Sequence, residues 1–116
     1  MIAHVVLVTP RSDLSASERA AAIETLRRAA SDVPEVLRCR IGRRVKHGLP
    51  GYEQRMPHNY ELALLLEFRD IDALQRYLKA PAHEALGRLF STASSAAIAY
   101  DYEIVEPADT AHLFMV

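Results

Sequence analysis

A tyrosine and a histidine stand six residues apart at a predicted junction between two helices. Tyr77 falls in the last turn of a helix expected over residues 71–78, which the next two residues break. Pro81 suits the first position of a second helix, expected to run to about residue 90, so His83 lies in its first turn. The positive end of the helix dipole favours a neutral imidazole there, which can accept a proton as a general base. Tyr77 could donate to a developing enolate or alkoxide oxygen.

The same two residues also fit a purely structural role. His83 then packs at the helix junction, and Tyr77 is a core aromatic whose hydroxyl reaches water. His4, on an apolar strand, is in that case a hydrogen-bonded core residue and not a ligand. No H-x-x-x-H or C-x-x-C spacing supports a metal site, and we expect none. Spacing alone favours the structural interpretation over the catalytic one.

The composition predicts one domain of ordinary size. The chain has 116 residues, of which 50% are hydrophobic, enough for a core. Its formal net charge of −1 argues against a general nucleic-acid binder. The apolar N-terminal run stops at Thr9-Pro10, too short for a signal peptide or a membrane span. The single cysteine, Cys39, excludes an intrachain disulfide and fits a reducing compartment. We therefore expect a cytoplasmic protein without nucleic-acid or membrane partners.

Apolar patterning predicts four strands and three helices. In chain order they form a strand, a helix, two strands, two short helices and a strand, over residues 2–8, 15–33, 36–45, 59–68, 71–78, 81–90 and 96–106. The first helix opens with Ser15 and Glu18 in a capping-box pattern, and Pro34 ends it. This order is that of the ferredoxin-like, split βαβ fold of the α+β class. Such a fold has a four-stranded antiparallel sheet with helices on one face.

Several of the predicted strands are apolar on both faces. His4, Val6 and Val8 share one face of the first strand, and the apolar residues between them share the other. In an antiparallel sheet with one solvent-exposed face, each strand should instead alternate between apolar and polar residues. No spare element could cover the second face, so we expect a homodimer in which two sheets pack face to face into a barrel. We place this domain over residues 1–107 and an apolar C-terminal tail over residues 108–116.

These features resemble the stress-responsive dimeric α/β-barrel (Dabb) family. The resemblance is carried by the segment from Tyr77 to Pro81-Ala82-His83, the first strand, Gly42, the run from Leu62 to Asp70, and Tyr100-Asp101-Tyr102. It covers the chain up to Pro107. The family includes olivetolic acid cyclase-like polyketide cyclases, which close a ring by intramolecular aldol condensation without a metal or organic cofactor. It also includes stress proteins with no assigned chemistry.

The resemblance to the cyclases implies a set of site residues. His83 and Tyr77 match their catalytic histidine and tyrosine. His4 matches a first-strand histidine, and Asp101 matches an aspartate of the last strand. Asp101 is then expected to accept from the second ring nitrogen of His83 and fix its tautomer. The substrate pocket is expected among His4, Leu26, Leu86 and Phe90, and Leu26 stands where the cyclases have a pocket tyrosine. No cofactor is implied.

The sequence leaves two main functional hypotheses open, and a third ranks below them. The first is a cofactor-independent cyclase-like or lyase-like enzyme that uses His83 as a base on a carbonyl-containing, polyketide-like small molecule. The second is a non-catalytic dimer that serves in stress response or binds a small hydrophobic ligand. The third is a cofactor-free monooxygenase, a class that shares the barrel but not the Pro-Ala-His segment. The basic run from Arg38 to Lys46 is expected to be a solvated strand face or a row of salt bridges at a dimer edge, with anion binding as the alternative.

Overall fold

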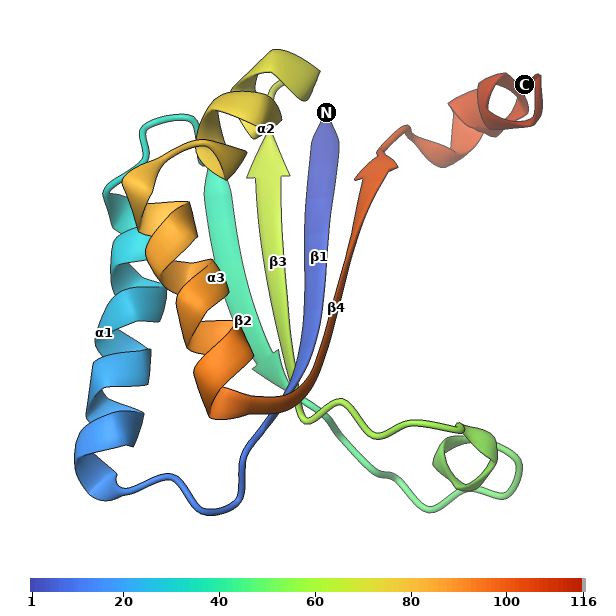
Figure 1. Ribbon diagram of the computed structural model, residues 1–116. Coiled ribbons are helices and arrows are strands. Elements are labelled where there is room, and N and C mark those ends of the chain that lie inside the picture. Colours follow the sequence, from blue (N-terminus) through green and yellow to red (C-terminus); the bar gives the residue numbers. More distant parts are fainter. Residues whose placement is uncertain (116) are drawn as a thin grey trace.

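A four-stranded antiparallel sheet forms the centre of the molecule, with helices packed on one face (Figure 1). The computed structural model describes residues 1–115. In sheet order the strands are β2 (Arg38–Arg43), β3 (Leu62–Phe68), β1 (Ile2–Pro10) and β4 (Ser94–Glu103). The helices are α1 (Ala16–Ser31), α2 (Ile71–Leu78) and α3 (Pro81–Ala93), and the 3₁₀ segments are η1 (Glu53–Arg55) and η2 (Pro107–Phe114). This topology confirms the predicted α+β, ferredoxin-like fold.

Side-chain caps fix the starts of two helices. Ser15 caps α1, because its hydroxyl accepts from the Glu18 amide at 3.1 Å and the Glu18 carboxylate accepts from the Ser15 amide at 3.0 Å. Asp70 caps α2 by accepting from the Ala73 amide at 2.8 Å. Element ends differ from expectation in places: α1 ends earlier, at Ser31, and α3 runs on to the start of β4. β2 and β3 are shorter than predicted because residues 44–61 leave the sheet.

The core lies between the sheet and the helices. The side chains of β1 and β3 that face the helices are buried: His4, Val6, Val8, Leu64, Leu66 and Phe68. Tyr77 of α2 and Leu86 of α3 pack onto them from the helical layer. Burial of a large apolar side chain stabilises a fold by about 1.5–3 kcal/mol. His4, Val6 and Val8 were predicted to share one face of the first strand, and the structure shows that this face points toward the helices.

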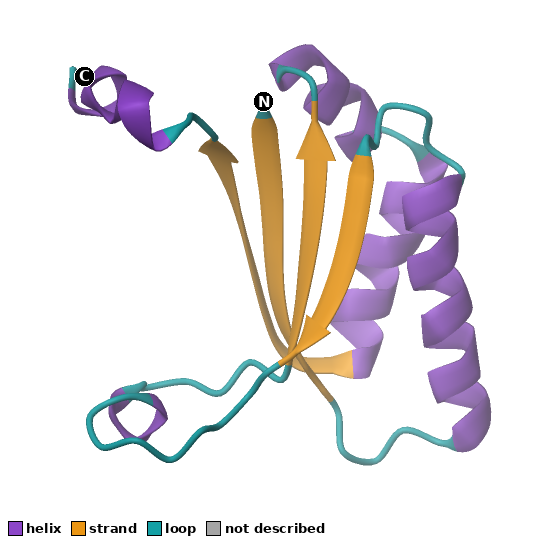
Figure 2. Ribbon diagram, turned by 180° about the vertical axis from the view of Figure 1, so that it is seen from behind, coloured by secondary structure: helices purple, strands orange, loops and turns teal. Residues whose placement is uncertain are grey.

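The opposite surface of the sheet, which we call the open face, carries no helix in the part of the chain that the structure describes (Figure 2). The strand register aligns Val5 of β1 with Leu65 of β3 and Tyr100 of β4, and Arg40 of β2 with Leu65. Because side chains alternate along a strand, these four residues form one row across the open face. Tyr100 is 57% exposed there. The open face is therefore apolar over β1, β3 and β4 and basic along β2.

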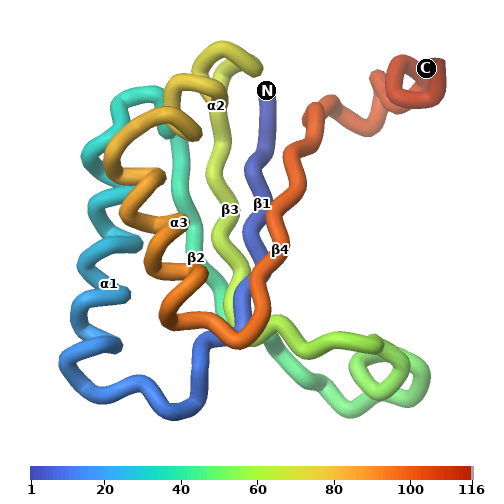
Figure 3. The backbone as a smooth tube through the Cα atoms, viewed as in Figure 1, coloured from blue at the N-terminus to red at the C-terminus, as the bar shows by residue number. Residues whose placement is uncertain are grey.

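Residues 44–61, which we call the arm, extend from the end of the sheet between β2 and β3 (Figure 3). Gly48 and Gly51 have φ angles of +79° and +89° in the arm, a conformation that favours glycine. Glu53 accepts from the Gly48 amide at 2.5 Å and lies 3.5 Å from His47. These contacts hold the tip of the arm in one compact turn.

The predicted apolar tail folds into the 3₁₀ segment η2 beyond β4. His112 Nε2 donates to the Glu103 carboxylate at 2.8 Å, which ties the segment to the end of β4. Phe114 is 82% exposed. Val116, the last residue of the predicted tail, lies outside the described residues.

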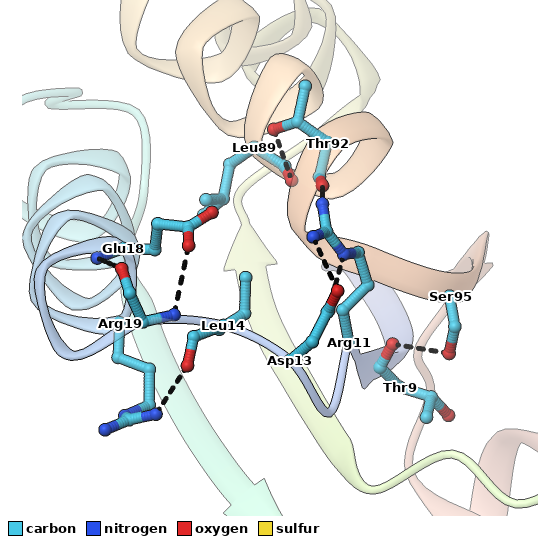
Figure 4. A network of polar contacts seen from close by, with 10 residues as sticks. Thr9, Arg11, Asp13, Leu14, Glu18, Arg19, Leu89, Thr92 and Ser95 are labelled. Carbon is cyan, nitrogen blue, oxygen red and sulfur yellow. Dashed lines mark hydrogen bonds and ion pairs between the residues drawn. The ribbon is translucent and has the colours of Figure 1, made fainter.

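The turn between β1 and α1 is tied to the far end of α3 (Figure 4). The Arg11 guanidinium donates to the Thr92 carbonyl at 2.6 Å, and the Arg11 amide donates to the Ala93 carbonyl at 2.8 Å. The same guanidinium pairs with Asp13 at 3.0 Å. These bonds hold α3 against β1 at the end of the helix opposite to His83.

Candidate active site

The chain turns between α2 and α3, and this turn brings Tyr77 and His83 together. The Ala80 amide donates to the Tyr77 carbonyl at 3.0 Å as α2 ends. Ala80 is extended, with ψ of 147°, and Pro81 takes the first position of α3. A proline has no amide to donate and disfavours a helical residue before it, so it starts the new helix. The rings of Tyr77 and His83 lie 5.0 Å apart at an interplanar angle of 64°. The predicted helix break is confirmed.

Tyr77 lies entirely inside the protein. Its exposed fraction is 0%, and its ring lies 5.0 Å from that of Phe68. Burial raises the pKa of the Tyr77 hydroxyl, with a smaller contribution from the Cys39 thiol, so the phenol stays protonated. The hydroxyl finds no hydrogen-bond partner within residues 1–115. Such an oxygen is a donor available to a carbonyl oxygen that enters its surroundings.

His83 is half-buried at the start of α3. Burial lowers the pKa of its imidazole, and the nearby His4 imidazole lowers it further. The Leu78 carbonyl and the Glu84 carboxylate oppose this shift in the pKa. The neutral ring expected from the sequence is therefore favoured, with burial as the largest cause.

Asp101 pairs with His4, whereas we expected it to orient His83. The two residues stand opposite each other in the register of β1 and β4, and His4 Nδ1 donates to Asp101 Oδ1 at 2.5 Å. His4 is 5% exposed, and the Asp101 side chain is 44% exposed. In a neutral imidazole this bond fixes the proton on Nδ1 and leaves Nε2 as an acceptor. The expected tautomer control is therefore found on the first-strand histidine.

The rings of His4, Tyr77 and His83 thus lie close together where α2 and α3 meet β1. The His4 ring lies 5.9 Å from Tyr77 and 6.4 Å from His83, between ring centroids. We call His4, Tyr77 and His83 the ring cluster. It combines a protonated phenol, a neutral imidazole and a second imidazole held by a carboxylate. Such a set can move a proton and stabilise a developing oxyanion.

The predicted pocket residues are divided between different places in the fold. His4 belongs to the ring cluster, and Leu86 is buried in the core. Leu26 and Phe90 line a small apolar cavity of about 50 Å³ near the start of β4, together with Val8. Their role in binding a substrate stays a prediction.

Asp101 also lines a groove of about 690 Å³ that sequence reasoning missed. Its other walls come from the start of β1, the start of α2 and the end of β4. Nothing in the local pattern joins these segments, which are brought together only by strand pairing. For the His4–Asp101 pair a signal did exist, because a ferredoxin-like sheet places its first and last strands side by side.

The basic run lies along the edge strand β2 and the start of the arm. Arg40 pairs with Glu67 of β3 at 3.3 Å, and Arg44 donates to the Asn59 side chain. The Arg40 pair is a salt bridge within one chain, and the expected salt-bridge row at a dimer edge stays a prediction. Within residues 1–115, no group of three or more His, Cys, Asp or Glu residues could hold a metal ion. The helices of the same region are all too short or too polar to cross a membrane.

Solved structures of the same fold support this topology. A hydroxynitrile lyase from Passiflora edulis superposes with a TM-score of 0.75 at 16% identity, covering 90% of this chain and 94% of that one. A Dabb family protein with a ferredoxin-like fold from Mesorhizobium loti gives 0.68 at 20% identity, covering 90% and 97%. A dimeric ferredoxin-like protein of unknown function from Jannaschia sp. gives 0.68 at 21% identity, covering 89% and 98%. Among curated proteins, none matches this sequence.

The topology and these neighbours define a small ferredoxin-like α+β domain, in which one sheet is backed by a single layer of helices. Residues 2–104 match the family described as the stress responsive A/B barrel domain, Dabb. The chain belongs to this family, as its sequence suggested.

Proposed function

We propose that this protein is a cofactor-independent enzyme that moves a proton on a small carbonyl compound. The observation that carries the proposal is the half-buried His4–Asp101 hydrogen bond of 2.5 Å beside the rings of Tyr77 and His83. A histidine with a purely structural role needs only a hydrogen-bond partner. Here two imidazoles lie beside a phenol hydroxyl that has no hydrogen-bond partner, which is more than such a role requires. The similar fold of the Passiflora hydroxynitrile lyase supports an enzymatic role for such a scaffold.

In the proposed step, neutral His83 takes a proton from the carbon next to the carbonyl group. The electron pair of that C–H bond moves into the enolate, whose oxygen accepts a hydrogen bond from the Tyr77 hydroxyl. The protonated imidazole then returns its proton to carbon, or to another atom of the same molecule in a ring closure or a cleavage. His4, held by Asp101, keeps a fixed acceptor nitrogen beside the reacting atoms. No further reactant is needed.

Exchange of carbon-bound protons with solvent tests this step. In D₂O, the wild-type protein should speed the loss of the acetyl ¹H signal of methyl 4-acetylbenzoate above the buffer rate. His83→Ala should slow the exchange by about 10²–10⁴-fold, the usual range for a general base. Tyr77→Phe should slow it by about 10²–10³-fold. The wild-type rate should fall as the pH drops through the lowered pKa of His83, because the protonated ring cannot accept a proton.

His47→Ala is the matched control, because His47 is a histidine of the arm that pairs with Glu53. It should leave the exchange rate unchanged. Tyr77→Phe should keep or raise the free energy of unfolding, since it removes a buried hydroxyl without a partner, so its loss of activity would not reflect unfolding. Equal exchange by wild type, His83→Ala and His47→Ala would contradict the proposed base.

We also propose that the protein acts as a homodimer built through the open face. Val5, Leu65 and Tyr100 form an apolar row there that a second sheet would cover. Dimeric neighbours of the same fold, such as the Jannaschia protein, support this arrangement.

The second candidate is a non-catalytic dimer that binds a small hydrophobic ligand. Two observations favour it: Tyr77 is completely buried, and the Leu26 and Phe90 side chains enclose a separate apolar cavity. In that case the wild type would show no exchange above buffer for any carbonyl probe. An apolar ligand would then perturb residues around Phe90 and leave His83 unaffected.

A further inference from the structure

A groove beside Asp101 reaches the carboxylate that bonds His4. It measures about 690 Å³, within the range of small-molecule sites. Ile2, Ile71 and Leu74 supply apolar wall, and the Asp101 carboxylate that lines it accepts from buried His4 at 2.5 Å. We propose that this groove binds the substrate of the proposed enzyme, and that it takes an uncharged carbonyl compound with an apolar body and rejects anions.

The charge of the groove indicates which class of substrate it would bind. Carboxylates from four residues line it: Asp70, Asp72, Asp101 and Glu103. Arg69 is the one cationic side chain among its described lining residues. Two of the carboxylates are held in place by histidines, since Asp101 bonds His4 and Glu103 accepts from His112 at 2.8 Å. An anionic ligand would be repelled by this excess of carboxylates. A neutral ligand would be stabilised by its apolar contacts with the groove without that repulsion.

Leu74 connects the groove with the ring cluster. It precedes Tyr77 by three residues in α2, so the two side chains share one face of the helix, and both are buried. Leu74 lines the groove, whereas Tyr77 packs behind it against Phe68. The groove is thus bounded by Asp101 on the side of His4 and by Leu74 on the side of Tyr77. None of the three rings is among the groove's lining residues, so the groove approaches the ring cluster only through Asp101 and Leu74.

This inference rests on the proposed function, and its test separates the two. Methyl 4-acetylbenzoate and 4-acetylbenzoate share one skeleton and differ in charge. Each is titrated into ¹⁵N-labelled protein while backbone amides are followed by NMR. The ester should shift the amides of Ile71, Leu74 and Tyr102 and bind about tenfold more tightly than the acid at low salt. Asp72→Asn combined with Glu103→Gln should narrow that ratio to about threefold.

Glu24→Gln is the control, because it removes a carboxylate from the exposed side of α1 and should leave the ratio near tenfold. Equal affinity for ester and acid overturns the charge selection. Shifts confined to residues around Leu26 and Phe90, or no shifts at all, overturn the groove as the binding site. Proton exchange measured on the same samples decides the function separately: binding in the groove without exchange overturns only the enzyme. Exchange without shifts in the groove overturns only this inference.

Discussion

Burial holds Tyr77 and His83 in complementary protonation states. Removal from water disfavours the charged form of any group, so it raises the pKa of the phenol and lowers that of the imidazole. One residue is thereby kept as a proton donor and the other as an acceptor. His4 gains its tautomer from Asp101 instead. The chemistry of the ring cluster follows from where three side chains are placed and needs no unusual residue type.

The lowered pKa of His83 predicts a stability that falls in acid. The folded protein binds the His83 proton less readily than the unfolded chain, whose imidazole titrates near 6.5. The stability that His83 contributes is fully present at a pH above the pKa of the unfolded chain. It is lost as the pH falls from that value toward the lower pKa of the folded protein. Urea unfolding at pH 7.5 and 5.0, at one protein concentration, should show a larger loss for wild type than for His83→Gln. An equal loss in both would contradict the shift.

At the scale of elements, α2 is the short helix on which the site depends. It carries Tyr77 in its last turn and Leu74 one turn earlier, and it is joined to α3 by the break at Pro81. A helix of 8 residues is not stable alone, so its cap and its packing must hold it. Asp70 provides the cap, and the buried face of α2 provides the packing.

Removal of the α2 cap should weaken the fold measurably. Asp70→Ala leaves the Ala73 amide without its acceptor and should lower the free energy of unfolding by about 1 kcal/mol. Asp70→Asn keeps a side-chain oxygen at the same position and should recover most of the loss. Chemical denaturation of the three proteins is the measurement. A destabilisation of the same size in both variants would show that the charge of Asp70, and not its cap, matters.

At the scale of the whole molecule, the open face has two unlike edges. Arg38 and Arg40 lie on β2, and Tyr100 and Tyr102 lie on β4, in matching cross-strand rows. A two-fold axis along the strands would set the β2 edge of one chain beside the β4 edge of the other, arginine against tyrosine. A two-fold axis across the strands would set arginines against arginines. Charge therefore favours the first arrangement in the proposed dimer.

Crosslinking between single-cysteine variants tests this arrangement. Cys39→Ser provides the background, into which Arg40→Cys and Tyr100→Cys are introduced separately. A mixture of the two proteins treated with a short bismaleimide should give a crosslinked dimer, and Tyr100→Cys alone should give far less. Efficient linkage of Tyr100→Cys to itself would support the other axis. Sedimentation of the untreated protein as a monomer at micromolar concentration would remove the dimer altogether.

The ferredoxin-like fold, the helix break at Pro81 and the sharing of one β1 face by His4, Val6 and Val8 were all predictable from sequence, because each depends on a local pattern. Capping residues, proline positions and alternation are properties of neighbours in the chain. The placing of Tyr77 beside His83 followed from the same local reasoning, since only six residues separate them. Membership of the Dabb family was likewise visible in the spacing of short motifs.

Tertiary structure alone decided the partner of Asp101, the division of the predicted pocket residues and the groove. The sequence put His4 and Asp101 on the first and last strands, but the register that sets them opposite each other depends on pairing across 97 residues. A shift of one residue would have turned Asp101 away from His4. Leu26 and Phe90 came to lie apart from the rings because α1 and α3 pack near the start of β4. Local patterns fixed each side chain's element and face, and long-range packing fixed which of them meet.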